Sequence, residues 1–77
     1  MRHTEIETFR AVMLMGSTHK AAAQLGVTQP AISQSLKRLQ AEAGVTLFVR
    51  AGARLMPTPE AQALLKEVER VFIGMDS

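Results

Sequence analysis

The stretch from Thr28 to Arg38 holds the residues whose types and spacing suit chemistry with a nucleic acid. In a helix that advances about 100° per residue, Gln34 and Lys37 fall on the side opposite Ile32. The amides of Gln29 and Gln34 each offer a donor and an acceptor, a pairing that suits the edge of a base and most naturally adenine. We therefore interpret this face as a candidate surface for reading bases in a major groove.

Neighbouring residues add contacts of other kinds. Pro30 and Ala31 can touch a thymine methyl group, while Thr28 and the free N–H groups of the first helical turn suit a phosphate. Lys20, early in the preceding helix, can reach backbone phosphate. A polar face of this composition is also typical of a helix that is simply solvated. The complete set predicted to bind DNA is Thr28, Gln29, Pro30, Ala31, Ser33, Gln34, Lys37, Arg38, Arg50, Arg54 and Lys20.

Two arginines flank a possible tight turn at Ala51-Gly52-Ala53. If the flanking segments pair as a hairpin, Arg50 and Arg54 can straddle a phosphate or enter the minor groove beside the major-groove helix. Arginines on an exposed hairpin can equally serve solubility alone. The sequence leaves both readings open.

Short helices joined by glycines must position these residues. Apolar residues at helical spacing, with Glu5, Glu7 and Arg10 on the other side, predict a first helix over about residues 4–15. Ser17 or Thr18 can cap a second helix that ends at Gly26. A third helix begins after the cap Thr28, carries Pro30 in its first turn and runs to about residue 43. Its inward stripe is Ile32, Leu36 and Leu39.

After Gly44 the pattern changes from helix to strand. The run VTLFVR, residues 45–50, is rich in β-branched and aromatic residues, and Arg54-Leu55-Met56 can return antiparallel before Pro57. Thr58 then caps a last helix that has Pro59 at its first position. The fold class is therefore mainly α: a winged helix-turn-helix of three helices and a two-stranded wing over residues 1–57, followed by a long final helix over residues 58–77.

The last helix carries apolar residues in a heptad rhythm over two repeats. Such a helix has more apolar surface than a body of 77 residues readily covers, so we expect it to pair with a second copy of the chain. The residues predicted at this dimer interface are Ala61, Leu64, Leu65, Val68, Phe72 and Met75.

Charge and composition narrow the function classes. Residues 17–56 hold five basic side chains against one acidic, a net charge of +4, whereas residues 58–77 carry a net charge of −2. The positive charge of residues 17–56 is suited to binding the phosphate groups of a nucleic acid. With no cysteine, no export signal and no run that can span a bilayer, we expect a cytoplasmic protein without disulfides or a membrane partner.

An enzyme is not expected. The isolated His3 and His19 have no carboxylate or cysteine at ligand spacing, so we assign no metal, no cofactor and no acid-base pair. Phosphate-binding loops, dinucleotide fingerprints and nucleophile elbows are also missing from the sequence.

Three segments carry a resemblance to a known family: AA at residues 21–22, VTQPAIS at residues 27–33 and LFVR at residues 47–50. Through these segments the chain resembles the N-terminal winged helix-turn-helix of LysR-type bacterial transcription regulators. The similarity covers essentially the whole chain. It implies a protein about four times longer, whose C-terminal domain, absent from this chain, senses a small molecule. It also implies dimers paired through the linker helix and tetramers on the operator. Within the family, three segments are similar to the matching segments of regulators that respond to lysine, octopine or nopaline: FRAVM, PTPEA and EVERVFIGMD.

Position by position, the resemblance assigns Thr28 to Lys37 to the recognition helix, and Arg50 and Arg54 to the wing. Four positions depart from the common pattern. Thr18 replaces a frequent apolar residue, which implies weaker packing at the start of the second helix, and Gln34 replaces a frequent arginine. Pro57 and Ala61 stand where leucine and glycine are usual.

A protein-interaction module is the main alternative function. Winged helices can bind proteins, and the acidic last helix can serve as a partner for another helix. A small helical enzyme is a third hypothesis, for which the sequence displays no acid and base pair. The sequence reveals neither the operator nor the effector, nor the sign of regulation.

Overall fold

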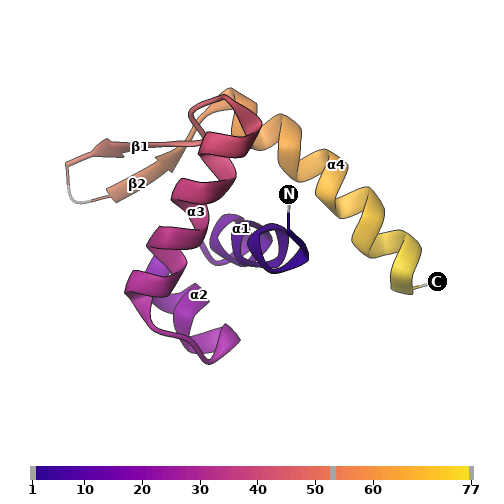
Figure 1. The fold of residues 1–77 in the computed structure, drawn as a ribbon, viewed down its shortest axis with the longest axis horizontal. Coiled ribbons are helices and arrows are strands. Elements are labelled where there is room, and N and C mark those ends of the chain that lie inside the picture. Colours follow the sequence, from indigo (N-terminus) through magenta and orange to yellow (C-terminus); the bar gives the residue numbers. More distant parts are fainter. Residues whose placement is uncertain (1, 53, 77) are drawn as a thin grey trace. The chain divides into compact units, whose positions relative to one another are not determined.

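The computed structural model describes residues 2–52 and 54–76, and the side chains of residues 72–76 lie outside that description. Within the described residues the order of elements is three helices, two strands and a fourth helix (Figure 1). The chain forms two compact units, Met1–Val45 and Thr46–Ser77. The predicted fold class, a winged helix-turn-helix followed by a long helix, is confirmed.

The first unit consists of α1 (His3–Met15), α2 (Thr18–Leu25) and α3 (Gln29–Ala43). Local hydrogen bonds set their ends. The Ser17 hydroxyl accepts from the Lys20 N–H at 3.2 Å, and the Thr28 hydroxyl accepts from the Ala31 N–H at 3.3 Å. Gly26 ends α2 with φ of 69°, a left-handed conformation that favours glycine. The predicted caps are therefore confirmed.

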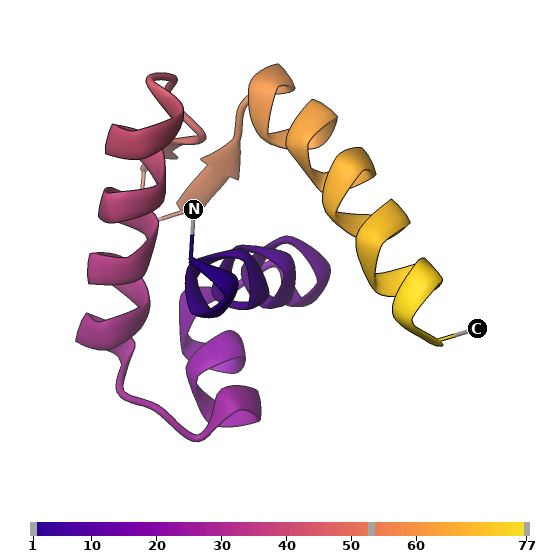
Figure 2. The same ribbon diagram turned by 45° about the vertical axis from the view of Figure 1, so that its right-hand side comes forward.

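Helices α1 and α2 lie on the same side of α3 in both Figure 1 and Figure 2. All three helices contact one another. The side of α3 that carries the predicted inward stripe is the buried one. The buried apolar residues of this unit are Phe9, Val12, Ala21, Ala22, Ile32, Leu36 and Leu39.

Helix α1 corrects one sequence expectation. Glu5 was expected on the polar side of this helix, but its side chain is only 2% exposed. The physical reason is spacing, because Glu5 precedes Phe9 by four residues and Val12 by seven and so shares their buried face. The Glu5 Oε1 accepts from the Arg2 N–H at 3.4 Å, whereas Oε2 has no hydrogen-bond partner among the described residues.

The second unit begins with a two-stranded antiparallel hairpin, β1 (Phe48–Ala51) and β2 (Arg54–Pro57). The structure differs from prediction at both of its ends: β1 starts at Phe48 and not at Val45, and β2 includes Pro57. The Thr58 N–H donates to the Leu47 carbonyl at 2.9 Å, which continues the register by one pair beyond Phe48 and Pro57. Helix α4 begins at the next residue, so the second strand has no residues left to pair with Val45 and Thr46.

Helix α4 (Pro59–Asp76) follows directly. The Thr58 hydroxyl caps it by accepting from the Ala61 N–H at 3.2 Å, and the same hydroxyl donates to the Thr46 carbonyl at 2.7 Å. Proline at the first position costs no hydrogen bond, because the first N–H groups of a helix have no partner inside it. Among the described residues, no helix combines the length and the apolar character needed to cross a lipid bilayer.

Candidate nucleic-acid interface

The outward face of α3 is the candidate surface for DNA. Ile32, Leu36 and Leu39 are between 0% and 5% exposed, which confirms the predicted inward stripe. On the remaining surface of the helix, Gln34 and Lys37 are exposed. The other exposed residues of this predicted set are Thr28, Pro30, Ala31 and Arg38.

Gln29 and Ser33 are half-buried at one margin of this surface and are bonded to each other. The Gln29 Nε2 donates to the Ser33 Oγ at 3.0 Å, one helical turn further along α3. It also donates to the Thr18 Oγ1 at 3.4 Å, in the first turn of α2. From the sequence alone, Gln29 is predicted to read a base independently, and this link to Thr18 is not indicated there. The four-residue spacing within α3 predicts the contact between Gln29 and Ser33. No local pattern predicts the contact between Gln29 and Thr18, which lie on different helices.

The first turn of α3 has less to offer a phosphate than predicted. Pro30 has no N–H, and the N–H of Ala31 is held by the Thr28 hydroxyl. The N–H of Ile32 donates to the Thr28 carbonyl at 3.2 Å. Only the backbone N–H of Gln29 remains in this turn, so a phosphate here would depend mainly on side chains.

Further basic side chains lie outside α3. Lys20 is exposed on α2, where its side chain is accessible to a ligand. His3 forms a 3.7 Å pair with Glu7 on the surface of α1, so this histidine has a local partner. Among the described residues no three metal-ligating side chains gather into a group that could hold an ion.

The hairpin places its two arginines on opposite faces. Arg50 is directly across from Leu55, and Arg54 is directly across from Ala51. Residues directly opposite share a face, and successive residues of a strand alternate between faces. Both arginines are exposed. They can contact a nucleic acid, but not by gripping one group from the same side of the hairpin.

Helix α4 carries the residues predicted to pair two chains. Ala61 and Val68 are buried in the single chain, whereas Leu64 and Leu65 are half-buried and Val71 is 59% exposed. The two remaining predicted residues, Phe72 and Met75, have side chains outside the described part. The dimer interface therefore stays a prediction, and the half-buried leucines have surface left to offer a partner.

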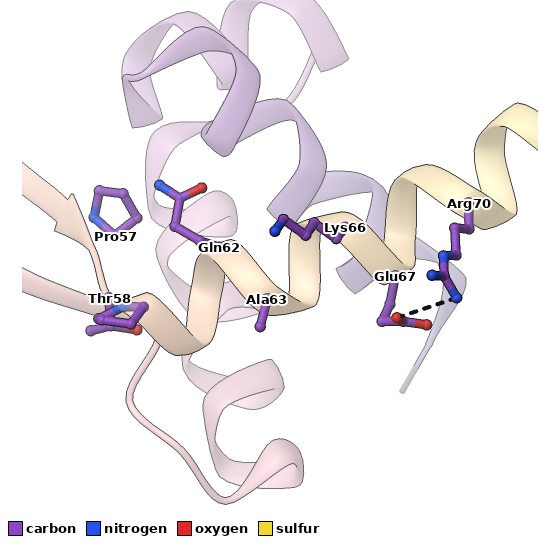
Figure 3. A pocket seen from close by; sticks show the side chains of 8 residues that line it. Pro57, Thr58, Gln62, Ala63, Lys66, Glu67 and Arg70 are labelled. Carbon is purple, nitrogen blue, oxygen red and sulfur yellow. Dashed lines mark ion pairs between the residues drawn. The ribbon is translucent and has the colours of Figure 1, made fainter.

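A shallow groove runs along α4 (Figure 3), and its lining includes four polar residues with no role predicted from the sequence: Gln62, Lys66, Glu67 and Arg70. Glu67 and Arg70, one turn apart, form an ion pair of 3.7 Å within it. Lys66 also lines this groove. Because the Glu67–Arg70 pair is largely exposed, we expect it to contribute little to stability.

Comparison with curated proteins finds relatives among bacterial regulators. The chain is 51% identical over 71 residues to the regulatory protein NocR of Agrobacterium fabrum (strain C58), a match covering 92% of this chain and 24% of NocR. It is 43% identical over 76 residues to the octopine catabolism/uptake operon regulatory protein OccR of Rhizobium meliloti, covering 99% of this chain and 26% of OccR. The chain spans about a quarter of the length of these curated relatives.

Solved structures of the same fold include complexes with DNA. The complex of the CbnR DNA-binding domain with DNA superimposes with a TM-score of 0.90 at 29% identity, covering 99% of this chain and 87% of that chain. The complex of the BenM DNA-binding domain with benA site 1 DNA gives a TM-score of 0.90 at 28% identity, covering 99% and 85%. Residues 3–62 match the model of the family described as bacterial regulatory helix-turn-helix protein, lysR family. The chain therefore belongs to the lysR family of bacterial regulatory helix-turn-helix proteins.

Proposed function

We propose that this chain is the DNA-binding part of a LysR-type transcription regulator that reads a specific operator with α3. One observation carries the proposal: α3 buries Ile32, Leu36 and Leu39 while it exposes Gln34 and Lys37. Its apolar side is thus occupied by the protein, and its polar side is available to the edges of bases. The DNA complexes of the structural neighbours support the same use of the fold.

The exposed residues divide into two roles. Gln34, with Pro30 and Ala31, is proposed to read base edges, because amide and apolar groups discriminate between base pairs in the major groove. Lys37, Arg38 and Lys20 are proposed to hold phosphates, which set register and affinity but carry no sequence information. The arginines of the hairpin contact the backbone or the minor groove.

The chemistry of an enzyme is not part of this proposal. The family is one of regulatory proteins and not of enzymes. The hypothesis of a small helical enzyme is therefore rejected.

The rest of the protein is proposed from the relatives. Because the chain spans about a quarter of their length, a further domain that binds a small-molecule effector accounts for the remainder. Two chains pair through α4, and dimers assemble into tetramers when the protein is full length. The name of OccR refers to octopine catabolism and uptake, so an opine or a related amino acid is the proposed class of effector. The protein acts in the cytoplasm, where its operator lies.

Binding of labelled promoter duplexes, followed by fluorescence anisotropy at increasing salt, tests this function. The expected result is a preference for particular promoters over random duplex. Affinity should also fall steeply with salt, by about 0.9 logarithmic units per phosphate neutralised for each logarithmic unit of salt. A flat salt response with no promoter preference would instead favour the protein-interaction module. In that case Gln34→Ala should leave binding of the protein partner unchanged.

A further inference from the structure

Thr18 on α2 and Gln29 on α3 are joined across the turn between the two helices. The Gln29 Nε2 lies 3.4 Å from the Thr18 Oγ1 and 3.0 Å from the Ser33 Oγ. A glutamine amide has two N–H donors and one carbonyl acceptor. Both donors therefore have a hydroxyl acceptor within the protein.

This arrangement determines which group Gln29 can present. Oε1 and Nε2 lie on opposite sides of the amide carbon, so anchoring Nε2 between two hydroxyls turns Oε1 away from them. Among the described residues, Oε1 has no hydrogen-bond partner in the protein. Gln29 is half-buried, so its side chain keeps access to the surface at the start of α3.

We propose that Thr18 is a positioning residue that, with Ser33, makes Gln29 a pure hydrogen-bond acceptor toward DNA. The inference rests on the proposed function and deepens it. In the major groove, the amino groups that an acceptor can read are N6 of adenine and N4 of cytosine. A glutamine that pairs with adenine in the usual bidentate way must also donate to N7, and the two hydroxyls hold the hydrogens needed for that bond.

The consequence is a defined base preference. At the position read by Gln29, the chain should accept adenine and cytosine alike and reject guanine and thymine, which present acceptors at the corresponding positions. Removing the Thr18 hydroxyl releases one N–H of Gln29. The bidentate contact then becomes available, and the preference should narrow to adenine.

The test begins with selection of duplexes from a randomised library by the unaltered chain, followed by affinity measurements on single-base variants. The position whose preference disappears in Gln29→Ala is the one that Gln29 reads. Thr18→Val, which keeps the shape of the side chain, should raise the adenine-to-cytosine affinity ratio there by about five- to 140-fold, the range of one bidentate contact. The gain should vanish when 7-deazaadenine replaces adenine.

Thr18→Ser is the matched control, because it keeps the hydroxyl and should retain the original preference. The Ser17 hydroxyl, and not that of Thr18, caps α2, so Thr18→Val leaves the cap in place. If Thr18→Val melts at a lower temperature than the unaltered chain, Thr18→Ala provides a second test of the same ratio.

Two results would overturn the inference while leaving the proposed function standing. The first is an unchanged adenine-to-cytosine ratio in folded Thr18→Val or Thr18→Ala. The second is an unaltered chain that already prefers adenine through N7. A different result, no sequence preference at any position in the unaltered chain, would overturn the proposed function and this inference together.

Discussion

Arg50 and Arg54 lie on opposite faces of the β1–β2 hairpin, although both flank its turn. Arg50 pairs with Leu55 and Arg54 with Ala51 in the antiparallel register, and each strand alternates its side chains between the two faces. Both are exposed. The hairpin therefore presents one positive charge on each face, an arrangement suited to two separate phosphates rather than to one.

Separate phosphates predict additive effects on DNA binding. The slope of log affinity against log salt is negative, and its magnitude should decrease by about 0.9 in each of Arg50→Ala and Arg54→Ala. In the double variant its magnitude should decrease by about twice that amount. Fluorescence anisotropy between low and moderate salt measures the slopes. If both arginines instead serve one phosphate, each single variant should leave the salt dependence nearly unchanged, and only the double variant should reduce the slope, by about 0.9.

The two classes of residue on α3 should respond differently to truncation. Gln34→Ala removes an amide that reads a base, so it should reduce discrimination by about 1–3 kcal/mol at one base pair and leave the salt slope unchanged. Lys37→Ala should weaken binding to all duplexes and lower the slope by about 0.9. Titrations against the preferred duplex and single-base variants distinguish them. If Lys37→Ala alters the preference at one base pair, its assignment to a phosphate is wrong.

Burial of Ile32 predicts a large loss of stability on truncation. This side chain is 1% exposed, so Ile32→Ala should lower the free energy of unfolding by about 2–5 kcal/mol through lost burial and a residual cavity. Urea unfolding followed by circular dichroism measures the change. Gln34→Ala, at an exposed position on the same helix, is the control. Its free energy of unfolding should stay within about 0.5 kcal/mol of that of the unaltered chain. A comparable loss for both would contradict the orientation of α3.

The buried carboxylate of Glu5 predicts a destabilising substitution. Glu5→Gln keeps a carbonyl that can accept from the Arg2 N–H, but it puts the two N–H donors of an amide where Oε2 lacks a partner among the described residues. It also removes an acidic side chain from the first turn of α1. The free energy of unfolding should fall by about 1–3 kcal/mol, since buried donors without acceptors are costly. Glu7→Gln, at an exposed position, is the matched control. If Glu5→Gln instead stabilises the chain in urea unfolding, the unpaired carboxylate oxygen is the costlier group.

The heptad pattern of α4 predicts a dimer that charge can separate. Leu65→Asp together with Phe72→Asp should yield a monomer in sedimentation velocity and weaken operator binding, because a charge in an apolar helix interface is left without a partner. Ala63→Asp, on an exposed side of α4, is the control and should remain dimeric. An unchanged sedimentation coefficient for the double variant would show that the chains pair elsewhere.

Local chemistry made much of the architecture predictable. Thr28 followed by Pro30, and Gly26 before them, specify the end of α2 and the start of α3, because a cap hydroxyl, a missing N–H and a left-handed residue act within a few residues. The stripe at Ile32, Leu36 and Leu39 predicted the buried side of α3 for the same reason, since helical periodicity alone places these residues together. The lysR-family resemblance, also read from the sequence, is confirmed.

The burial of Glu5 shows where that approach failed. A carboxylate was expected in water, but its place four residues before Phe9 puts it on the buried face of α1. The start of β1 was missed for another reason: helix α4 begins at Pro59, so the returning strand ends before it could pair with Val45. The strand propensity of residues 45–47 does not reveal where their partner strand ends.

The amino-acid sequence by itself determined the helices, their caps and the inward side of α3, because each depends on hydrogen bonds and periodicity within one or two helical turns. Only the tertiary structure decided that Thr18 holds the Gln29 amide from another helix and that Arg50 and Arg54 face apart. Those relationships join residues on different elements. They depend on helix packing and strand register, which arise only when distant parts of the chain meet.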